Sequence, residues 1–445
     1  MIVKNNSKSV SFYTLGCKLN FSETSTIAES FRDAGYQEVP FEENSDVCVI
    51  NTCSVTENAD KKFYNILKKI KKFNPQSYVI VVGCYAQLKP NDISQIKGVN
   101  LVLGANEKFD VVNYFENNIN SKNKSYCCEI SQVNQFHSSF SIGSRTRGFL
   151  KVQDGCDYKC TYCTIPKARG VSRSDSIENI LSQADDMVSK GVKEIVLTGV
   201  NIGDYGKGEF GNKKHNNTFL ELLERLDKIE YLERIRISSI EPNLLTSKII
   251  LFIKNSNKLV PHFHIPLQSG CNKILGLMQR RYSTNLYLSK INEIKKLIPN
   301  ACIGADVIVG FPGETNGDFL ETYNFLKSLN ISYLHVFSFS GRMDTKAYNM
   351  PNKVGLPEKY SRSKMLRILS TKKTRKFYTE NKDFIHSVLF ESENKNGFIY
   401  GYTSNYIRVK TYWDPTLSNK ILDVYIESIG VDGIVNVKVK NEIYA

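Results

Sequence analysis

Residues 148–170 read GFLKVQDGCDYKCTYCTIPKARG, and this stretch places three cysteines directly after a run of strand-forming residues. Cys156, Cys160 and Cys163 have the spacing C-x3-C-x2-C, which allows three thiolates to surround one inorganic centre. A structural zinc site needs four nitrogen or sulfur ligands, and no further Cys or His follows until His215. Three cysteines suit an iron–sulfur cluster that keeps one iron open to another ligand. The segment therefore predicts such a cluster at the end of a strand, with zinc as the alternative.

The segment opens a series of six strand-like runs that alternate with helical patterns. The runs are GFLKVQD, EIVLTGV, RIRISSI, PHFHIPLQ, IGADVIVG and YLHVFSF, and the helical patterns lie at 176–189, 219–229, 244–255, 284–297 and 314–329. Repeated βα units predict parallel strands with helices outside, but six units are too few to close an eight-stranded barrel. We expect a partial, open (βα)6 barrel over residues 142–371, with its chemistry where strands end.

A second set of cysteines lies in the N-terminal region, residues 8–118, where SVSFYTLG, DVCVINT, SYVIVVG and LVLG alternate with helical patterns. This rhythm predicts a parallel α/β sheet domain. Cys17, Cys53 and Cys84 each directly follow a strand-like run, about one βα unit apart. Because the carboxyl ends of parallel strands share one edge, these thiols could converge there. Alone they would indicate buried structural cysteines; beside the barrel motif they predict a second three-cysteine cluster.

The rest of the chain consists of connections and one all-β region. Residues 119–141 are polar and predict a linker, in which Cys127 and Cys128 are expected to be structural. Residues 375–441 contain HSVLFES, GFIYGYTS, YIRVKTYW, ILDVYIESIG and GIVNVKVK, which predict a small all-β barrel after a basic stretch. Cys48, Cys271 and Cys302 lack a strand-end placement and are expected to be core or loop thiols.

Charge favours a polyanionic partner. The 445 residues contain 59 Lys and Arg against 45 Asp and Glu, a net charge of +14, which indicates nucleic acid before a membrane surface. Six lysines between Lys61 and Lys72 lie on a predicted helix over 56–73, where they form a solvated face or an RNA contact. We find no secretory or membrane-spanning segment, and the eleven cysteines suit a reducing compartment, so a cytoplasmic protein without a membrane partner is expected.

Taken together, these features resemble the radical S-adenosylmethionine methylthiotransferases over essentially the whole chain. The motifs that carry the resemblance are TLGCKLN at 14–20, INTC at 50–53, VVGCYAQ at 81–87, GCDYKCTYCTIPKARG at 155–170 and GFPGET at 310–315. TLGCKLN, PKARG and LTGVNIGDYG at 197–206 are similar to the branch that modifies threonylcarbamoyladenosine in tRNA. The alternatives are the branches that act on isopentenyladenosine in tRNA and on a ribosomal-protein aspartate.

The resemblance implies two [4Fe-4S] clusters and S-adenosyl-L-methionine, which serves as methyl donor and radical source. The cluster on Cys156, Cys160 and Cys163 would cleave S-adenosylmethionine to a 5′-deoxyadenosyl radical that attacks C2 of the adenine at position 37. The cluster on Cys17, Cys53 and Cys84 would donate sulfur. The implied partners are tRNA, through its anticodon stem-loop, and an unidentified electron donor and sulfur source. The C-terminal barrel resembles the RNA-binding TRAM module.

Polar residues at the expected strand ends are candidates for contacts with S-adenosylmethionine: Thr198, Gly199, Asn201, Ser239, Glu241, His264, Gln268 and Asp306. TGVN at 198–201 lacks the Gly-Gly-Glu common in radical enzymes, so the partner of the amino group stays open. Arg169 is a further candidate, for a carboxylate or phosphate of a ligand, with a solvated surface position as the alternative. His262 and His264 project the same way, and we expect core hydrogen bonds rather than a metal pair.

One hypothesis from another functional class is a non-enzymatic iron–sulfur protein that binds RNA or carries electrons. Such a protein needs the cysteines but has no use for a six-unit barrel with cofactor-like strand ends.

Overall fold

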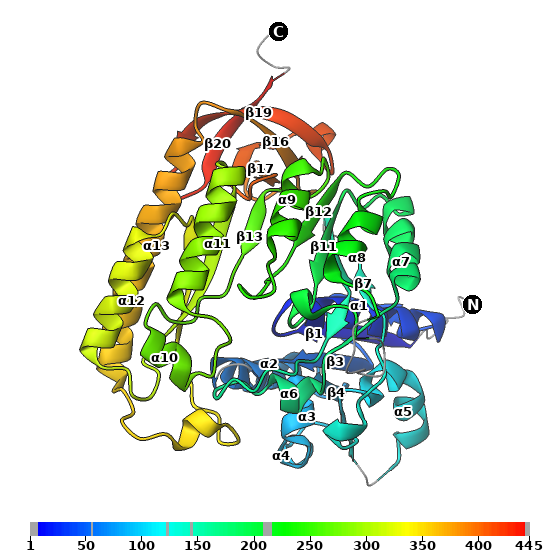
Figure 1. Cartoon of the computed structure of the whole chain (residues 1–445). Helices are drawn as coiled ribbons and strands as arrows, with labels where there is room; N and C mark the ends of the chain where they lie inside the picture. The colour runs from blue at the N-terminus through cyan, green and yellow to red at the C-terminus, as the bar shows by residue number, and fades with distance from the viewer. Residues whose placement is uncertain (1–7, 55–56, 122–123, 143–145, 208–215, 441–445) are drawn as a thin grey trace.

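The computed structural model describes residues 8–54, 57–121, 124–142, 146–207 and 216–440. Three bodies follow one another along the molecule (Figure 1): the N-terminal sheet domain, drawn blue to cyan, a central partial barrel, and a red β-barrel at the opposite end. The predicted three-part fold is confirmed.

The N-terminal sheet is parallel and has the strand order β2-β1-β3-β4-β5-β6. The strands are β1 (Ser9–Thr14), β2 (Gln37–Glu38), β3 (Val47–Thr52), β4 (Tyr78–Gly83), β5 (Leu101–Leu103) and β6 (Ser125–Tyr126). Helices α1 (Lys18–Asp33) and α5 (Val111–Asn118) pack on one face, while α2 (Glu57–Phe73) and α4 (Pro90–Ser94) pack on the other. A short helix α3 (Cys84–Leu88) and a 3₁₀ turn η1 (Glu107–Asp110) complete the domain. The strand order reverses direction between β1 and β3, and α/β sheets bind ligands at such a switch point.

The segment predicted as a linker, 119–141, is more ordered than its polar composition indicated. β6 extends the N-terminal sheet, η2 (Ile130–Gln132) follows it, and β7 (Phe140–Ser141) pairs antiparallel with the first barrel strand. Val133 and Phe136 are buried. The segment still joins the two domains, and it is ordered because open sheet edges supply partners for backbone N–H and C=O groups whatever the side chains are.

The central body has six parallel strands, as predicted. They are β8 (Arg147–Lys151), β11 (Glu194–Thr198), β12 (Arg234–Ile237), β13 (His262–His264), β14 (Cys302–Val309) and β15 (Tyr333–Ser338). The ladders β12-β11-β8 and β13-β14-β15 are joined by bridges Ile235–Leu259 and Ser239–His264. No strand of the described chain pairs with the free edge of β15, so the barrel is open there.

Helices surround this barrel on its outer side. The outer helices are α7 (Ile177–Ser189), α8 (Phe219–Leu226), α9 (Ser247–Asn255), α11 (Thr284–Leu297) and α12 (Asn316–Ser328). Each begins with a Ser or Thr whose side chain accepts a backbone N–H, namely Ser176, Thr218, Thr246, Ser283 and Thr315. Shorter elements occupy the loops: β9 (Gln153–Asp154), α6 (Ile165–Arg169), β10 (Arg173–Ser174), η3 (Ile202–Asp204), α10 (Asn272–Leu277) and η4 (Lys346–Asn349).

The last body is a closed barrel of order β16-β17-β18-β20-β19. Its elements are β16 (Ile385–Phe390), β17 (Phe398–Thr403), β18 (Arg408–Tyr412), η5 (Pro415–Leu417), β19 (Ile421–Ile429) and β20 (Val435–Val439), matching the five predicted strands. Helix α13 (Leu356–Glu380) leads into it and spans the boundary expected between 371 and 375. The basic residues there are good helix formers, so one helix continues from the central body into the last one.

The two outer domains dock at opposite ends of the central barrel. Arg234, at the amino end of β12, donates to the backbone oxygens of Ser387 and Tyr402 in the C-terminal barrel. The loop after β8 carries α6 against α3 of the N-terminal domain. The N-terminal domain therefore lies where the barrel strands end. No helix in the described ranges is both long and apolar enough to span a bilayer.

Candidate active site

Three thiols come together at the carboxyl edge of the N-terminal sheet. Cys17 precedes α1 as its N-cap, Cys53 follows β3, and Cys84 opens α3 after β4. Gly16 has the left-handed φ of +114°, and a Cβ placed there would lie 2.9 Å from Cβ and 3.3 Å from Sγ of Cys53. None of the three thiols is in a disulfide bond. The sheet thus brings residues 36 and 31 positions apart to the switch point between β1 and β3.

The second set of thiols occupies the loop between β9 and α6. The Cys163 N–H donates to the Cys160 oxygen at 3.1 Å, which turns the loop back on itself. Two donors point at its sulfurs: the Tyr158 N–H lies 3.4 Å from Cys156 Sγ, and Arg280 Nη1 lies 3.0 Å from Cys160 Sγ. Burial raises the pKa of the Cys156 thiol to about 12. Three free thiols with N–H donors fit an iron–sulfur cluster, whose iron displaces the thiol protons and whose sulfurs accept hydrogen bonds.

Arg169, the last residue of α6, joins the barrel segment that carries the second set of thiols to α1 of the N-terminal domain. Its guanidinium is 3% exposed and donates to Glu23 Oε1 at 2.8 Å, to Asp154 Oδ1 at 3.0 Å and to Asn20 Oδ1 at 2.8 Å. Asn20 Oδ1 lies 3.8 Å from Cys17 Sγ. Burial excludes the solvated surface position for Arg169, and the carboxylates with which it pairs belong to the chain itself.

Further buried charges extend this contact across the domain interface. Lys108 of the N-terminal domain lies 2.7 Å from Glu23 Oε2, and Lys151 of β8 lies 2.9 Å from Asp154 Oδ2. Burial opposes ionisation of Glu23, but Arg169, Lys108 and Lys151 hold its pKa well below the ordinary value. The buried cations outnumber the two carboxylates, so each carboxylate keeps a partner when one cation is removed, whereas removing Glu23 would leave Lys108 buried without its partner.

The candidate cofactor contacts at the end of β11 differ in whether their polar atoms already have hydrogen-bond partners. The Thr198 hydroxyl donates to the Val196 oxygen at 3.1 Å, and Gly199 lies so close to Gln153 that a Cβ would meet its Oε1 at 3.0 Å. Asn201 is 4% exposed, and neither atom of its carboxamide has a hydrogen-bond partner in the described chain. A buried amide without partners fits a polar ligand at this strand end.

The next strand ends carry a charged pair beside the barrel thiols. Glu241, after β12, is ion-paired with Arg280, which also contacts Cys160. Ser239 forms a β-bridge with His264. Gln268 has a left-handed φ of 65°, and its backbone N–H donates to the backbone oxygen of Asp306 at 2.8 Å. Sequence reasoning missed Arg280; its signal is a pair of arginines separated from the end of α10 by two residues.

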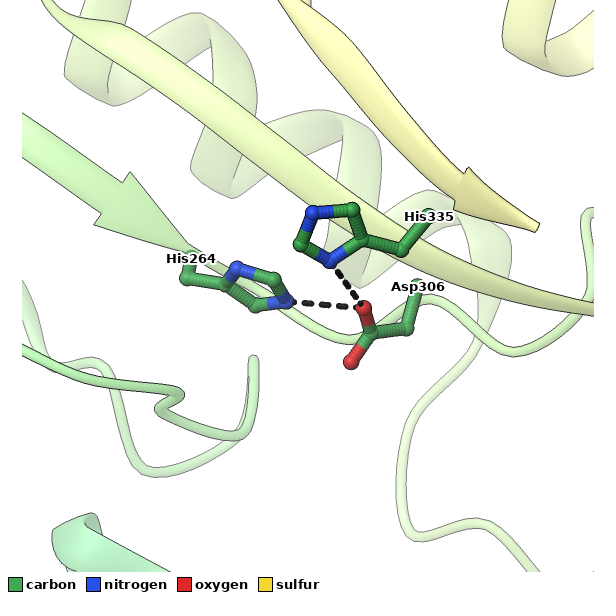
Figure 2. A group of neighbouring side chains, drawn as sticks. All are labelled: His264, Asp306 and His335. Carbon is green, nitrogen blue, oxygen red and sulfur yellow. Dashed lines mark hydrogen bonds and ion pairs between the residues drawn. The ribbon is translucent and has the colours of Figure 1, made fainter. Parts of the chain in front are cut away.

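His264 and Asp306 lie together with a residue that the sequence did not indicate, His335 (Figure 2). Asp306 Oδ1 is 2.9 Å from His264 Nε2 and 3.2 Å from His335 Nδ1. Burial opposes ionisation of Asp306, yet the two histidines hold its pKa below the ordinary value. As expected, His262 is hydrogen-bonded in the core, with its Nε2 3.0 Å from the Tyr333 hydroxyl.

A groove of about 920 Å³ runs along the open side of the barrel. It lies between α2, β15 and α13, and its basic lining residues are Lys61, Lys359, Lys364 and Arg367. Tyr360, on α13, is 73% exposed beside them. The predicted helix with its lysines is confirmed as α2, and five of those six lysines are exposed. An exposed aromatic ring among cations suits a nucleic acid.

Two family models match this chain. Residues 9–104 match "Uncharacterized protein family UPF0004", and residues 150–326 match "Radical SAM superfamily". The first covers most of the N-terminal sheet, and the second covers the barrel from β8 through most of α12.

Curated relatives span nearly the whole chain. The chain is 38% identical to the threonylcarbamoyladenosine tRNA methylthiotransferase MtaB of Bacillus subtilis, over 95% of this chain and 94% of the relative. It is 39% identical to the protein of that name from Aquifex aeolicus, over 90% and 96%. A tRNA-2-methylthio-N(6)-dimethylallyladenosine synthase of Clostridium botulinum is 35% identical, over 86% of each chain.

A solved structure shares the fold. The radical S-adenosylmethionine methyltransferase TsrM from Kitasatospora setae, with a tryptophan substrate and a SAM analogue, superposes with a TM-score of 0.55 at 12% identity, covering 74% of this chain and 73% of that one.

Proposed function

Because this chain belongs to the radical S-adenosylmethionine methylthiotransferase family, we propose that it attaches a methylthio group to C2 of N6-threonylcarbamoyladenosine at position 37 of tRNA. The observation that carries the proposal is the 38–39% identity to two threonylcarbamoyladenosine tRNA methylthiotransferases over at least 90% of the chain. The relative named for dimethylallyladenosine is less similar over a shorter span, which makes that substrate the second choice.

Two sets of three thiols, none of them in a disulfide bond, support the assignment of two [4Fe-4S] clusters. Cys156, Cys160 and Cys163 would hold the cluster that binds S-adenosylmethionine, and Cys17, Cys53 and Cys84 would hold the one that donates sulfur. When bound, these groups supply the one-electron chemistry and the sulfur that an unactivated aromatic C2–H requires. The chain contributes their placement: Arg169 and α6 keep the two thiol sets on facing sides of one interface.

Charged and amide groups near the barrel thiols match the polar end of S-adenosylmethionine. Glu241 and Arg280 offer one negative and one positive group beside Cys160, as a zwitterionic amino acid requires. The unpartnered amide of Asn201 supports a further contact at the end of β11. Thr198 is the weakest candidate, because its hydroxyl bonds the backbone of its own strand.

Substrate tRNA would lie across the groove between α2 and α13 and contact the C-terminal barrel. The net charge of +14 and the lysines and arginine of the groove support phosphate contacts with the anticodon stem-loop. The target base must leave its stack to reach the strand ends. A tRNA substrate also favours a cytoplasmic location. An electron donor and a sulfur source complete the reaction as partners of unassigned identity.

The decisive experiment compares two substrates with the same enzyme. Anaerobically reconstituted protein is incubated with S-adenosylmethionine, a reductant, and tRNA that carries either threonylcarbamoyladenosine or isopentenyladenosine. Nucleoside mass spectrometry should find the 2-methylthio derivative in the first reaction alone. Product in the isopentenyladenosine reaction alone would overturn the substrate assignment, and 5′-deoxyadenosine without product in either tRNA would overturn the methylthiotransferase proposal.

A further inference from the structure

We propose that His264, Asp306 and His335 form a binding site for one divalent transition-metal ion of the Zn²⁺ or Fe²⁺ class, separate from both cysteine sets. The three residues come from three neighbouring strands, β13, β14 and β15 (Figure 2). Asp306 is paired directly with His335, and His264 is paired with Gly304, two positions before Asp306. Because side chains alternate along a strand, this register puts all three on one face of the sheet.

The donor atoms are close enough for one ion. Two imidazole nitrogens and a carboxylate oxygen lie within 4.8 Å of one another. Both nitrogens already point at the same oxygen, at 2.9 and 3.2 Å, so small side-chain movements would let all three atoms coordinate one ion. Two histidines and one carboxylate are a donor set typical of zinc and of non-haem Fe²⁺, and three ligands leave positions open for water or an oxygen ligand.

A hydrogen-bonded support holds one of the imidazoles in the required orientation. The Tyr333 hydroxyl lies 3.3 Å from His264 Nδ1 and 3.0 Å from His262 Nε2. The Tyr333 ring fits there because Gly304 has no side chain; a Cβ at Gly304 would lie only 2.1 Å from the ring. With Nδ1 engaged by Tyr333, His264 presents Nε2 to the ion. Metal-binding histidines use their second nitrogen in this way.

Two observations favour this site: it is accessible from solvent, and its ligands are less engaged elsewhere than those of a second candidate group. The His335 side chain is 53% exposed, and it lines a cavity of about 300 Å³ next to Tyr333 and Tyr406. Within the described part of the chain, Cys271, Asp318 and Glu321 form the other three-residue group with suitable atoms. There, however, Asp318 caps α12 through Thr315 and pairs with Lys273 at 2.7 Å, so it has less freedom to bind an ion.

The test is a Zn²⁺ titration of the full-length enzyme with both clusters loaded, in competition with a chromophoric chelator. We expect one tight equivalent of Zn²⁺ in the native protein. His335→Gln and Asp306→Asn should each weaken it at least about 100-fold, and Tyr333→Phe about 10-fold, because the support of a ligand contributes less than the ligand itself. Glu321→Gln, the matched control in the rival group, should leave the affinity unchanged.

X-ray absorption at the zinc edge separates this site from the cysteines. Nitrogen and oxygen neighbours at roughly 2.0–2.1 Å are expected, without sulfur at about 2.3 Å. Iron and sulfide content, measured on the same samples, shows whether the clusters stayed in place. The proposal is overturned if native protein binds no tight Zn²⁺, if the bound ion has sulfur ligands, or if His335→Gln and Asp306→Asn bind as the native protein does.

Discussion

The two sets of thiols are each brought together at one site, but by different levels of structure. Cys156, Cys160 and Cys163 lie within eight residues on one loop, so local chain geometry brings them together. Cys17, Cys53 and Cys84 are spread over sixty-eight residues and meet because three parallel strands end at one edge. A local site depends on its loop, whereas a dispersed site depends on the fold of a whole domain. Mutations remote from the thiols should therefore harm the N-terminal site more than the barrel site.

The largest expected effect is the separation of the two sites by function. Cys160→Ala should abolish the formation of 5′-deoxyadenosine and of product. Cys53→Ala should abolish product but still cleave S-adenosylmethionine, because the barrel thiols remain intact. Both are measured as 5′-deoxyadenosine and methylthiolated nucleoside from one reaction.

Cys48→Ala is the matched control for Cys53→Ala. Cys48 lies within β3, the strand that Cys53 follows, and is buried in the core, so its loss should lower stability slightly and leave product formation intact. Normal thiolation by Cys53→Ala would refute the sulfur-donating role of the N-terminal thiols.

A second, smaller effect tests the bridge between the sites. Arg169→Gln removes buried hydrogen bonds to the carboxylates of Glu23 and Asp154, which keep Lys108 and Lys151 as partners, and should lower the free energy of unfolding by about 1.5–3 kcal/mol. Arg32→Gln, which breaks an exposed pair with Glu38, should lower it by less than about 1 kcal/mol. Urea unfolding of both variants measures the difference. Equal losses would mean that the buried bridge adds nothing beyond a surface pair.

Gly16→Ala examines how much the dispersed site depends on its sheet edge. A methyl group there would lie 2.8 Å from Asn20 Nδ2 and 2.9 Å from Cys53 Cβ, so about 1–3 kcal/mol of crowding adds to the backbone strain. Gly35→Ala, also at a left-handed φ, meets nothing within 4 Å and reports the strain alone. In a background without Cys156, Cys160 and Cys163, iron content should fall in Gly16→Ala but stay at about four irons in Gly35→Ala. Full iron in Gly16→Ala would show that the edge tolerates displacement.

The smallest expected effect concerns the barrel cluster alone. Arg280→Gln removes a cationic donor from Cys160 Sγ, which should lower the reduction potential of that cluster by tens of millivolts and leave the N-terminal cluster unchanged. Arg281→Gln is the control, because Arg281 stacks on Tyr158 instead. Potentiometric titration followed by electron paramagnetic resonance resolves the two clusters. A shift of the same size in both variants would indicate a general charge effect.

Much of the architecture followed from periodic patterns. The six barrel strands, four of the N-terminal strands and all five C-terminal strands were predicted, because buried β-runs bounded by turn residues are strong local signals. β2, β6, β7 and β10 were missed, since two-residue strands have no hydrophobic pattern of their own. α13 crossed a predicted domain boundary because helix propensity does not stop where one core ends.

The candidate site divides in the same way. Strand-end placement indicated all six cysteines and Asn201, because spacing and order along the chain determine which residues stand at a sheet edge. The pairing of Arg169 with Glu23 and Asp154, the contact of Arg280 with Cys160, and the meeting of His335 with Asp306 join residues 15 to 146 positions apart. Such partners are chosen by how elements pack, not by neighbours in the chain. By itself the sequence determined the three-part fold, the two thiol sets and the basic surface. Only the tertiary structure decided which charged side chains lie beside those thiols and strands. The reason is that buried charges must be paired, and the sequence alone does not show which of many possible partners lies within reach.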